Sequence, residues 1–162
     1  MKSRRKCVID SNLLVLYIAG RVDLGIIDKH KRLKEFQKSD HALLEQHLST
    51  FTGVMVTPNV LTETSNLLGY HGEPERTKLF QHLRDIISNS TELLVESVAA
   101  SAAEEFPRFG LCDSVILTIA SPDQQVLTMD RALHGLCNKK TPNSSVCFDD
   151  LRFPMQRHWQ RR

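Results

Sequence analysis

Short runs dominated by apolar residues recur along the chain, without the strict apolar–polar alternation of a strand that has one wet face. These runs cover residues 7–10, 54–57, 92–96, 125–128 and 145–148. Strands that are apolar on both faces are typical of parallel sheets, because helices cover both sides of such a sheet. The pattern therefore predicts short, buried and mostly parallel strands.

Between these runs, apolar residues recur at the spacing of helices. The expected helices cover residues 12–19, 41–50, 58–68, 74–87, 97 to just before Pro107, 111–120 and 131–137. We expect Gly20 to end the first of them and Asp40 to cap the second. Thr57 is expected to cap the third, with Pro58 in the favoured first position. Residues 21–38 are polar and irregular, and we expect a loop there with some helix.

Strand and helix candidates alternate over the whole length of 162 residues. This alternation indicates an α/β fold, in which helices pack on both faces of a parallel sheet. No repeat, low-complexity tract or linker divides the chain. We therefore expect a three-layer α/β/α sandwich around a mostly parallel, short-stranded sheet. The domain is expected over residues 1–150, followed by a basic C-terminal tail over residues 151–162.

Composition argues against a membrane protein and against a zinc protein. No window approaches the roughly 18 uncharged apolar residues that a membrane-spanning helix needs. The basic start is like that of a signal peptide, but Asp10 and Asn12 interrupt the apolar run that follows. We therefore expect a cytoplasmic protein. The cysteines have no C-x-x-C spacing and are expected to be reduced, buried thiols; they are Cys7, Cys112, Cys137 and Cys147.

The formal net charge is only +2, so the total gives no sign of nucleic-acid binding. Basic residues nevertheless gather in residues 29–34 and 157–162. Each patch alone is more simply explained as a solvated face or tail, and Trp159 as a residue packed on the domain surface. Beside a metal site, the same patches become candidate contacts to phosphates and one base. The candidate nucleic-acid-binding residues are Lys29, Lys31, Arg32, Lys34, Arg157 and Trp159.

Four acidic residues follow or interrupt apolar segments: Asp10, Glu63, Asp113 and Asp130. A charge in a buried apolar stretch is costly unless something compensates for it. Asp10 and Asp130 end the first and fourth strand candidates, and ligands bind at the carboxyl ends of parallel strands. Helix capping, the helix dipole or a neighbouring base explains each acid separately, but not all four at one edge. The set predicts a divalent-cation site.

The segments that hold these acids resemble the PIN-domain family of nucleases. They are IDSNLL at residues 9–14, PNVLTE at 58–63, GLCDS at 110–114 and VLTMD at 126–130. They stand in the order of the family, and the match spans residues 7–148. The resemblance implies coordination of Mg²⁺ or Mn²⁺ by the four acids. It also implies supporting positions for Asn12, Ser114 and Thr128.

The activity implied by this resemblance is metal-dependent hydrolysis of RNA, preferably single-stranded, to products with a 5′-phosphate and a 3′-hydroxyl. Hard oxygen ligands select Mg²⁺ or Mn²⁺, which activates water for in-line attack on a phosphodiester. We expect Asp10 and Asp113 to be direct ligands, and Glu63 and Asp130 to complete the shell or orient a water. The implied partners include an antitoxin protein and a second copy of the chain. The helices at residues 58–68 and 74–87 are candidates for a dimer face, although core burial explains their leucines equally well.

Other functions fit the motifs less well. A haloacid-dehalogenase-type phosphatase needs a second aspartate where this chain has Asn12, and a receiver domain needs adjacent acids where residues 2–6 are basic or neutral. A PIN-fold binding module with little or no activity is the stronger alternative. The presence of all four acids argues against it, because degenerate members commonly lose one. The long stretch between Gly20 and Phe51 leaves toxin and RNA-processing roles open.

Overall fold

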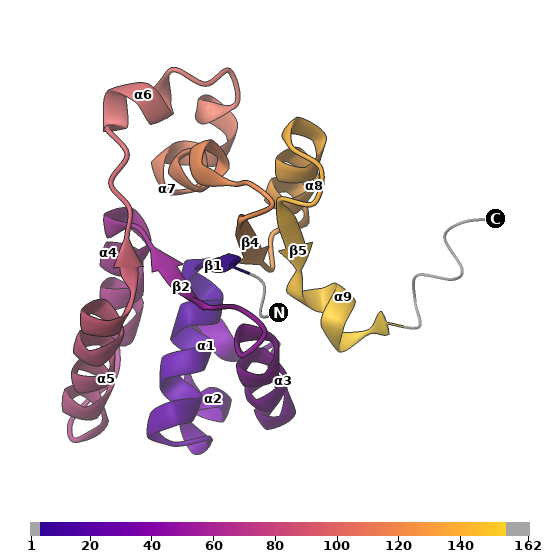
Figure 1. Cartoon of the computed structure of the whole chain (residues 1–162). Helices are drawn as coiled ribbons and strands as arrows, with labels where there is room; N and C mark the ends of the chain where they lie inside the picture. The colour runs from indigo at the N-terminus through magenta and orange to yellow at the C-terminus, as the bar shows by residue number, and fades with distance from the viewer. Residues whose placement is uncertain (1–3, 155–162) are drawn as a thin grey trace.

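The computed structural model describes residues 4–154 and has one five-stranded, all-parallel sheet at its centre (Figure 1). The strand order is β3-β2-β1-β4-β5, and each neighbouring pair is parallel. This confirms the expected α/β sandwich. The strands are β1 (Lys6–Ile9), β2 (Gly53–Val56), β3 (Thr91–Glu92), β4 (Gln124–Thr128) and β5 (Ser145–Cys147).

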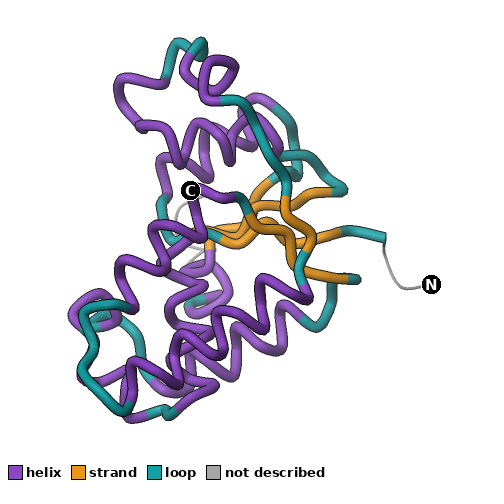
Figure 2. Tube along the Cα trace, turned by 90° about the vertical axis from the view of Figure 1, so that its left-hand side faces the viewer, coloured by secondary structure: helices purple, strands orange, loops and turns teal. Residues whose placement is uncertain are grey.

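Helices cover both faces of the sheet, as Figures 1 and 2 show from two directions. One layer contains α1 (Ser11–Val22), α2 (Gly25–Lys29), the 3-10 helix η1 (Lys31–Leu33), α3 (Lys38–Leu48), α4 (Pro58–Leu68) and α5 (Glu75–Asn89). The other contains α6 (Ser97–Ser101), α7 (Phe106–Ile119) and α8 (Arg131–Lys140). A short helix, α9 (Phe148–Arg152), follows β5 and contacts α3. No helix within residues 4–154 is long and apolar enough to cross a membrane.

The hydrophobic core is centred on β1, which lies between β2 and β4. Cys7, Val8 and Ile9 are fully buried there. Strands apolar on both faces suit this central position, because helices remove both faces from water. Burial raises the pKa of the Cys7 thiol to about 12. All four cysteines are free; three are buried as expected, but Cys112 is only half-buried, contrary to the expectation of four buried thiols.

The expectation that Gly20 ends the first helix is wrong. α1 continues to Val22, and Gly20 lies where the ring of His41 on α3 packs against the α1 backbone. A Cβ atom at this position would overlap that ring. His41 also donates a hydrogen bond from Nε2 to the Tyr17 carbonyl at 3.1 Å. Gly20 lies inside α1, and its lack of a side chain permits the close contact between α1 and α3.

Asp40 is not the N-cap residue of α3, contrary to expectation. The cap is Gln37, and Asp40 lies in the first turn, where its Oδ2 accepts the Gln37 backbone N–H at 2.7 Å. The other oxygen, Oδ1, pairs with Nε of Arg152 on α9 at 3.1 Å. Asp40 therefore stabilises the start of α3 and joins it to the last helix. Thr57 and Pro58, in contrast, open α4 as expected, and the Thr57 side chain accepts the Val60 N–H.

The expected helix from residue 97 to Pro107 is also wrong in its extent. α6 ends at Ser101, and Pro107 lies in the first turn of α7. Proline is tolerated there because a first-turn N–H has no partner within the helix. α7 is kinked at Gly110, which has a φ of 77°, a left-handed value that favours glycine. The straight part of α7 then begins at Leu111, where the sequence predicted a helix.

The remaining differences concern short elements. β3 is confined to Thr91–Glu92 rather than residues 92–96, and α9 was not expected. Residues 21–38 contain α2 and η1, in agreement with a loop that includes some helix. α9 anchors Arg152 in the domain, so the first residues of the expected 151–162 tail belong to the fold. Arg157 and Trp159 lie outside the described residues.

Candidate active site

The carboxyl ends of β1 and β4 form a topological switch point. The helices that follow β1 and β2 lie on one face of the sheet, and those that follow β3 and β4 lie on the other (Figure 1). β1 and β4 are neighbours, so the chain leaves these two strands toward opposite faces. In open parallel sheets such a point forms a crevice that binds ligands. Asp10 and Asp130 stand directly at this crevice.

The carboxylate of Asp10 is buried and held on both oxygens. Asp10 is the N-cap of α1, and its Oδ1 accepts the Ser11 N–H at 2.8 Å. Its Oδ2 accepts the hydroxyl of Thr128 at 2.7 Å. Only 8% of Asp10 is exposed. The orientation of this carboxylate is therefore set by β1, α1 and β4 together.

Thr128 connects Asp10 with Asp130. While its hydroxyl donates to Asp10, its Oγ1 accepts the backbone N–H of Asp130 at 3.0 Å. Asp130 in turn caps α8, because its Oδ1 accepts the N–H groups of Ala132 and Leu133. Asp10 and Asp130 are thus both helix caps. This structural role does not prevent them from also belonging to the candidate site. The supporting position expected for Thr128 corresponds to a direct contact with Asp10.

Asp113 and Glu63 come from helices on opposite faces of the sheet. Asp113 is the third residue after the kink in α7, and Glu63 is an exposed residue of α4, which contacts α7. Burial raises the pKa of Asp113 to about 7, and the charges of Asp10, Asp130 and Glu63 contribute to the rise. Burial also raises the pKa of Asp10, against hydrogen bonds that lower it, and the charges of Glu63 and Asp130 add to the rise. The structure therefore brings the four predicted acids within electrostatic reach of one another.

No ion pair neutralises this negative charge within residues 4–154. Four hard oxygen donors that repel one another suit Mg²⁺ or Mn²⁺ in chemistry and in charge. Among the described residues, however, no three His, Cys, Asp or Glu side chains form a group that could hold a metal ion as they stand. Both oxygens of Asp10 and one of Asp130 accept protein hydrogen bonds instead. The four carboxylates therefore fit a divalent cation in their chemistry, although their side chains are not arranged around one.

The two other supporting residues have weaker ties to the acids. Ser114 is buried beside Asp113, and Asn12 is half-buried in the first turn of α1. Neither side chain hydrogen-bonds to the four carboxylates among the residues that the structure describes. Cys112, which the motif contains, lies close to Glu63; burial and the Glu63 charge raise the pKa of its thiol. This thiol therefore stays protonated.

A shallow pocket lies between α4 and the residues that follow the kink of α7. It has a volume of about 400 Å³. Three polar side chains, Asn59, Thr62 and Asn66, share this wall of α4 with Glu63. They explain why α4 is more polar than a packed helix needs. The full lining is Pro58, Asn59, Thr62, Glu63, Asn66, Leu111 and Cys112.

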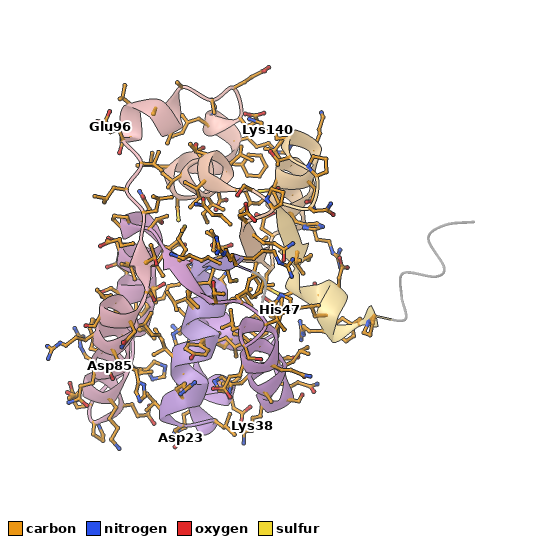
Figure 3. All side chains as sticks on the ribbon, in the orientation of Figure 1. Asp23, Lys38, His47, Asp85, Glu96 and Lys140 are labelled. Atoms are coloured by element: carbon orange, nitrogen blue, oxygen red, sulfur yellow. The ribbon has the colours of Figure 1, made fainter. Side chains whose placement is uncertain are left out.

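The basic residues of segment 29–34 lie away from the acids. They belong to α2 and η1, which follow α1, whereas Asp10 precedes it; α1 is about 18 Å long at about 1.5 Å per residue. In Figure 3, Asp23 and Lys38, which flank this segment in sequence, lie at the end of the helical layer remote from the sheet. Lys29, Lys31 and Arg32 line a second pocket there, and Lys34 does not.

The sequence interpretation missed two residues of this second pocket, Tyr70 and His71. They come about 40 residues after the basic segment in sequence, so no local pattern connects the two segments. The available signal was Tyr70 itself, a large aromatic residue placed between the end of a helix and Gly72. An aromatic residue in such a turn is seldom part of the core, and Tyr70 is 83% exposed.

Because the pKa of Asp113 is raised, we expect the stability of the metal-free protein, measured in EDTA, to depend on pH. Below about pH 4 the folded and unfolded chains both carry a proton on this carboxyl; between about pH 4 and 7 the unfolded chain loses it first. The free energy of unfolding should therefore fall as the pH rises through this window. Asp113→Asn should reduce this dependence and stabilise the protein at pH 8 by on the order of 2–4 kcal/mol, which is less than the full value of about 1.4 kcal/mol per pKa unit because solvent screens a half-buried carboxylate. Urea unfolding at several pH values measures both effects.

The matched control is Asp123→Asn, which replaces an exposed aspartate in the turn before β4, at the opposite edge of the sheet. It should leave the pH profile of the wild type unchanged. Parallel pH profiles for the wild type and Asp113→Asn would contradict the prediction.

No family model, curated protein or solved structure matches this chain.

Proposed function

We propose that this protein is a metal-dependent endoribonuclease of the PIN type that hydrolyses phosphodiester bonds in single-stranded RNA. The observation that carries the proposal is that Asp10 and Asp130, at the carboxyl ends of β1 and β4, lie within electrostatic reach of Asp113, as do Asp10 and Asp113 of Glu63, with no cationic partner among the described residues. An uncompensated cluster of this kind costs stability. A divalent cation is the simplest way to compensate for these charges. The same cation can catalyse phosphoryl chemistry, which would explain why the carboxylates are kept despite their cost.

In this proposal Asp10 and Asp113 hold Mg²⁺ or Mn²⁺, and Glu63 and Asp130 complete the shell or orient the attacking water. The bound ion supplies a more acidic water and neutralises charge on the phosphate oxygens. Thr128 fixes the Asp10 carboxylate through its 2.7 Å hydrogen bond, as outer-sphere residues of metal sites commonly do. Water adds to phosphorus and the 3′ oxygen leaves, which gives a 5′-phosphate and a 3′-hydroxyl.

The pocket beside Glu63 suits a polynucleotide better than a small substrate. It is shallow, and besides Glu63 its polar side chains are two amides and a hydroxyl, which can donate to phosphate and sugar oxygens along a chain. A small-molecule site is more often deep and largely apolar. RNA rather than DNA follows from the family resemblance.

A direct test incubates the purified chain with end-labelled, unstructured RNA in Mg²⁺, in Mn²⁺ and in EDTA. We expect cleavage with either ion, none in EDTA, and 5′-phosphate ends on the downstream products. Cleavage in EDTA, or products with a 2′,3′-cyclic phosphate, would contradict the mechanism. Binding of RNA without cleavage under every condition would favour the alternative function, a PIN-fold binding module.

The biological setting that we propose is a toxin–antitoxin pair, with a second copy of the chain as a further partner. The leucines of α4 and α5 that were considered for a dimer face, such as Leu67, Leu68, Leu79 and Leu83, are buried in the core of this single chain. A small DNA-binding protein encoded beside this gene would support the toxin setting. Its absence would favour RNA processing.

A further inference from the structure

The second pocket combines positive charge, aromatic surface and a preformed shape. It has a volume of about 530 Å³ and lies between residues 29–32 and residues 70–72. Lys31 and Arg32 are exposed and form no ion pair with any carboxylate of residues 4–154. Lys29 pairs with Glu75 at 3.3 Å. Two uncommitted cations therefore face a concave surface, an arrangement that suits phosphate groups.

The two walls of the pocket are tied together by His30. Its Nδ1 accepts the backbone N–H of Arg32 at 3.1 Å, and its Nε2 donates to the carbonyl of Leu67 at 3.1 Å. His30 is 3% exposed, so this connection between η1 and the end of α4 is shielded from water. The pocket is therefore a built feature of the fold and not a gap between loose loops.

Aromatic surface is available for stacking. Tyr70 is 83% exposed although it lines the pocket, and nothing within residues 4–154 explains why a tyrosine stands there. The ring of His71 is mostly buried and lies tilted by 33° against that of His30, with centroids 4.9 Å apart, so Tyr70 is the aromatic ring that remains accessible. Exposed aromatic rings beside cations are typical of single-stranded nucleic-acid binding, because bases stack on the rings while cations contact the backbone. An acidic peptide would use the cations and leave the exposed Tyr70 ring without a role.

A polar strip along α4 connects this pocket with the acidic site. Thr62 and Asn66 are exposed and four residues apart, and Tyr70 follows at the same spacing. Gly69 keeps helical backbone angles after α4 ends, so the three side chains follow one face. The distance along the axis from Glu63 to Tyr70 is about 10 Å, which a few nucleotides can span.

We propose that the pocket formed by Lys31, Arg32, Tyr70 and His71 is an anchor site for single-stranded RNA, which stacks a base on Tyr70 and continues along α4 to the carboxylates. This inference rests on the proposed function for the identity of the ligand. It adds a binding site outside the catalytic residues. Binding at the anchor requires no divalent cation.

Anisotropy of a labelled oligouridylate in EDTA tests the anchor separately from catalysis. We expect Tyr70→Ala to weaken binding by about tenfold, through loss of one stacked base. The double variant Lys31→Ala/Arg32→Ala should weaken binding similarly and reduce the slope of log K against log salt by about 1.4, or about 0.7 per phosphate contact. The matched control is Arg84→Ala/Lys139→Ala, which removes two exposed cations from α5 and α8. It should leave the affinity within about twofold of the wild type.

The outcomes separate this inference from the nuclease proposal. If both pocket variants bind RNA like the control, the anchor is wrong, whether or not the wild type cleaves RNA. If the pocket variants lose binding but the wild type never cleaves RNA with Mg²⁺ or Mn²⁺, the anchor stands and the nuclease proposal fails. Equal competition by uridine monophosphate or by a polyglutamate peptide would also overturn the anchor, because the pocket would then recognise a mononucleotide or an acidic chain.

Discussion

Replacing Asp10 or Asp113 by asparagine is expected to lower the rate of RNA cleavage by at least about a hundredfold. Loss of a residue that only supports a metal ligand already costs roughly 10- to 100-fold, and these two are the proposed direct ligands. Asparagine keeps the shape of the side chain and removes its charge. The comparison uses initial rates on the same labelled RNA in saturating Mg²⁺.

We do not expect a loss of folding to explain slow cleavage by these two variants. Burial and neighbouring carboxylates disfavour the charged forms of Asp10 and Asp113, so neutral asparagines should fold at least as stably without metal, provided that the Thr128 hydroxyl keeps its bond. Functional residues commonly cost stability in this way. Asp123→Asn serves again as the control and should cleave at the wild-type rate. Wild-type rates in both Asp10→Asn and Asp113→Asn would rule out the four-carboxylate mechanism.

The largest expected loss of stability is that of Arg152→Ala, which we expect to lower the free energy of unfolding by about 3 kcal/mol. Arg152 and Asp40 form an ion pair whose side chains are only 10% and 11% exposed. Removing one partner of such a pair leaves an uncompensated buried charge. The same guanidinium pairs with Asp149, donates to the Glu35 carbonyl at 2.6 Å, and lies over the ring of Phe36. Urea unfolding at pH 7 measures the change.

A matched comparison is Arg131→Ala. Arg131 also pairs with a carboxylate of α9, Asp150, but its side chain is 61% exposed. Exposed pairs contribute about 0–1 kcal/mol because water and salt screen them. Arg152→Lys should recover only part of the loss, since an ammonium cannot reproduce the planar contacts. Equal losses in Arg131→Ala and Arg152→Ala would show that α9 does not depend on the buried pair.

Local patterns were sufficient where one short segment determined its own structure. The apolar run before Asp10 forms β1, and Thr57-Pro58 opens α4 as their capping chemistry predicts. Predictions failed where a distant residue decided the outcome. Gly20 is an ordinary helix-ending signal until the His41 ring is known to pack on it. Asp40 is a good capping residue by type, and it does act locally by accepting the Gln37 N–H, but its ion pair with Arg152, 112 positions away, could not be predicted.

The same distinction applies to the two functional regions. Asp10 and Asp130 could be placed together because each follows a strand of one parallel sheet, and the ends of parallel strands share an edge. The location of the basic segment could not be predicted in this way, since it belongs to no strand and its neighbours Tyr70 and His71 come from another part of the chain. The spacing of residues in the sequence indicates which helix or strand they belong to. Which elements become neighbours, such as η1 and the end of α4, is decided by tertiary packing.

The central position of β1 has a consequence for how steadily the acidic site is held. Backbone amides in a strand paired on both sides exchange with solvent deuterium only through global opening, whereas edge elements open locally. β1 is such a strand, and the Asp10 N–H continues its ladder with a bond to the Leu127 carbonyl at 3.1 Å. We therefore expect the Asp10 amide to be among the slowest to exchange. The Asp10 backbone should stay in position while other parts of the fold fluctuate locally. Binding of a ligand to its carboxylate then requires little additional ordering of the protein.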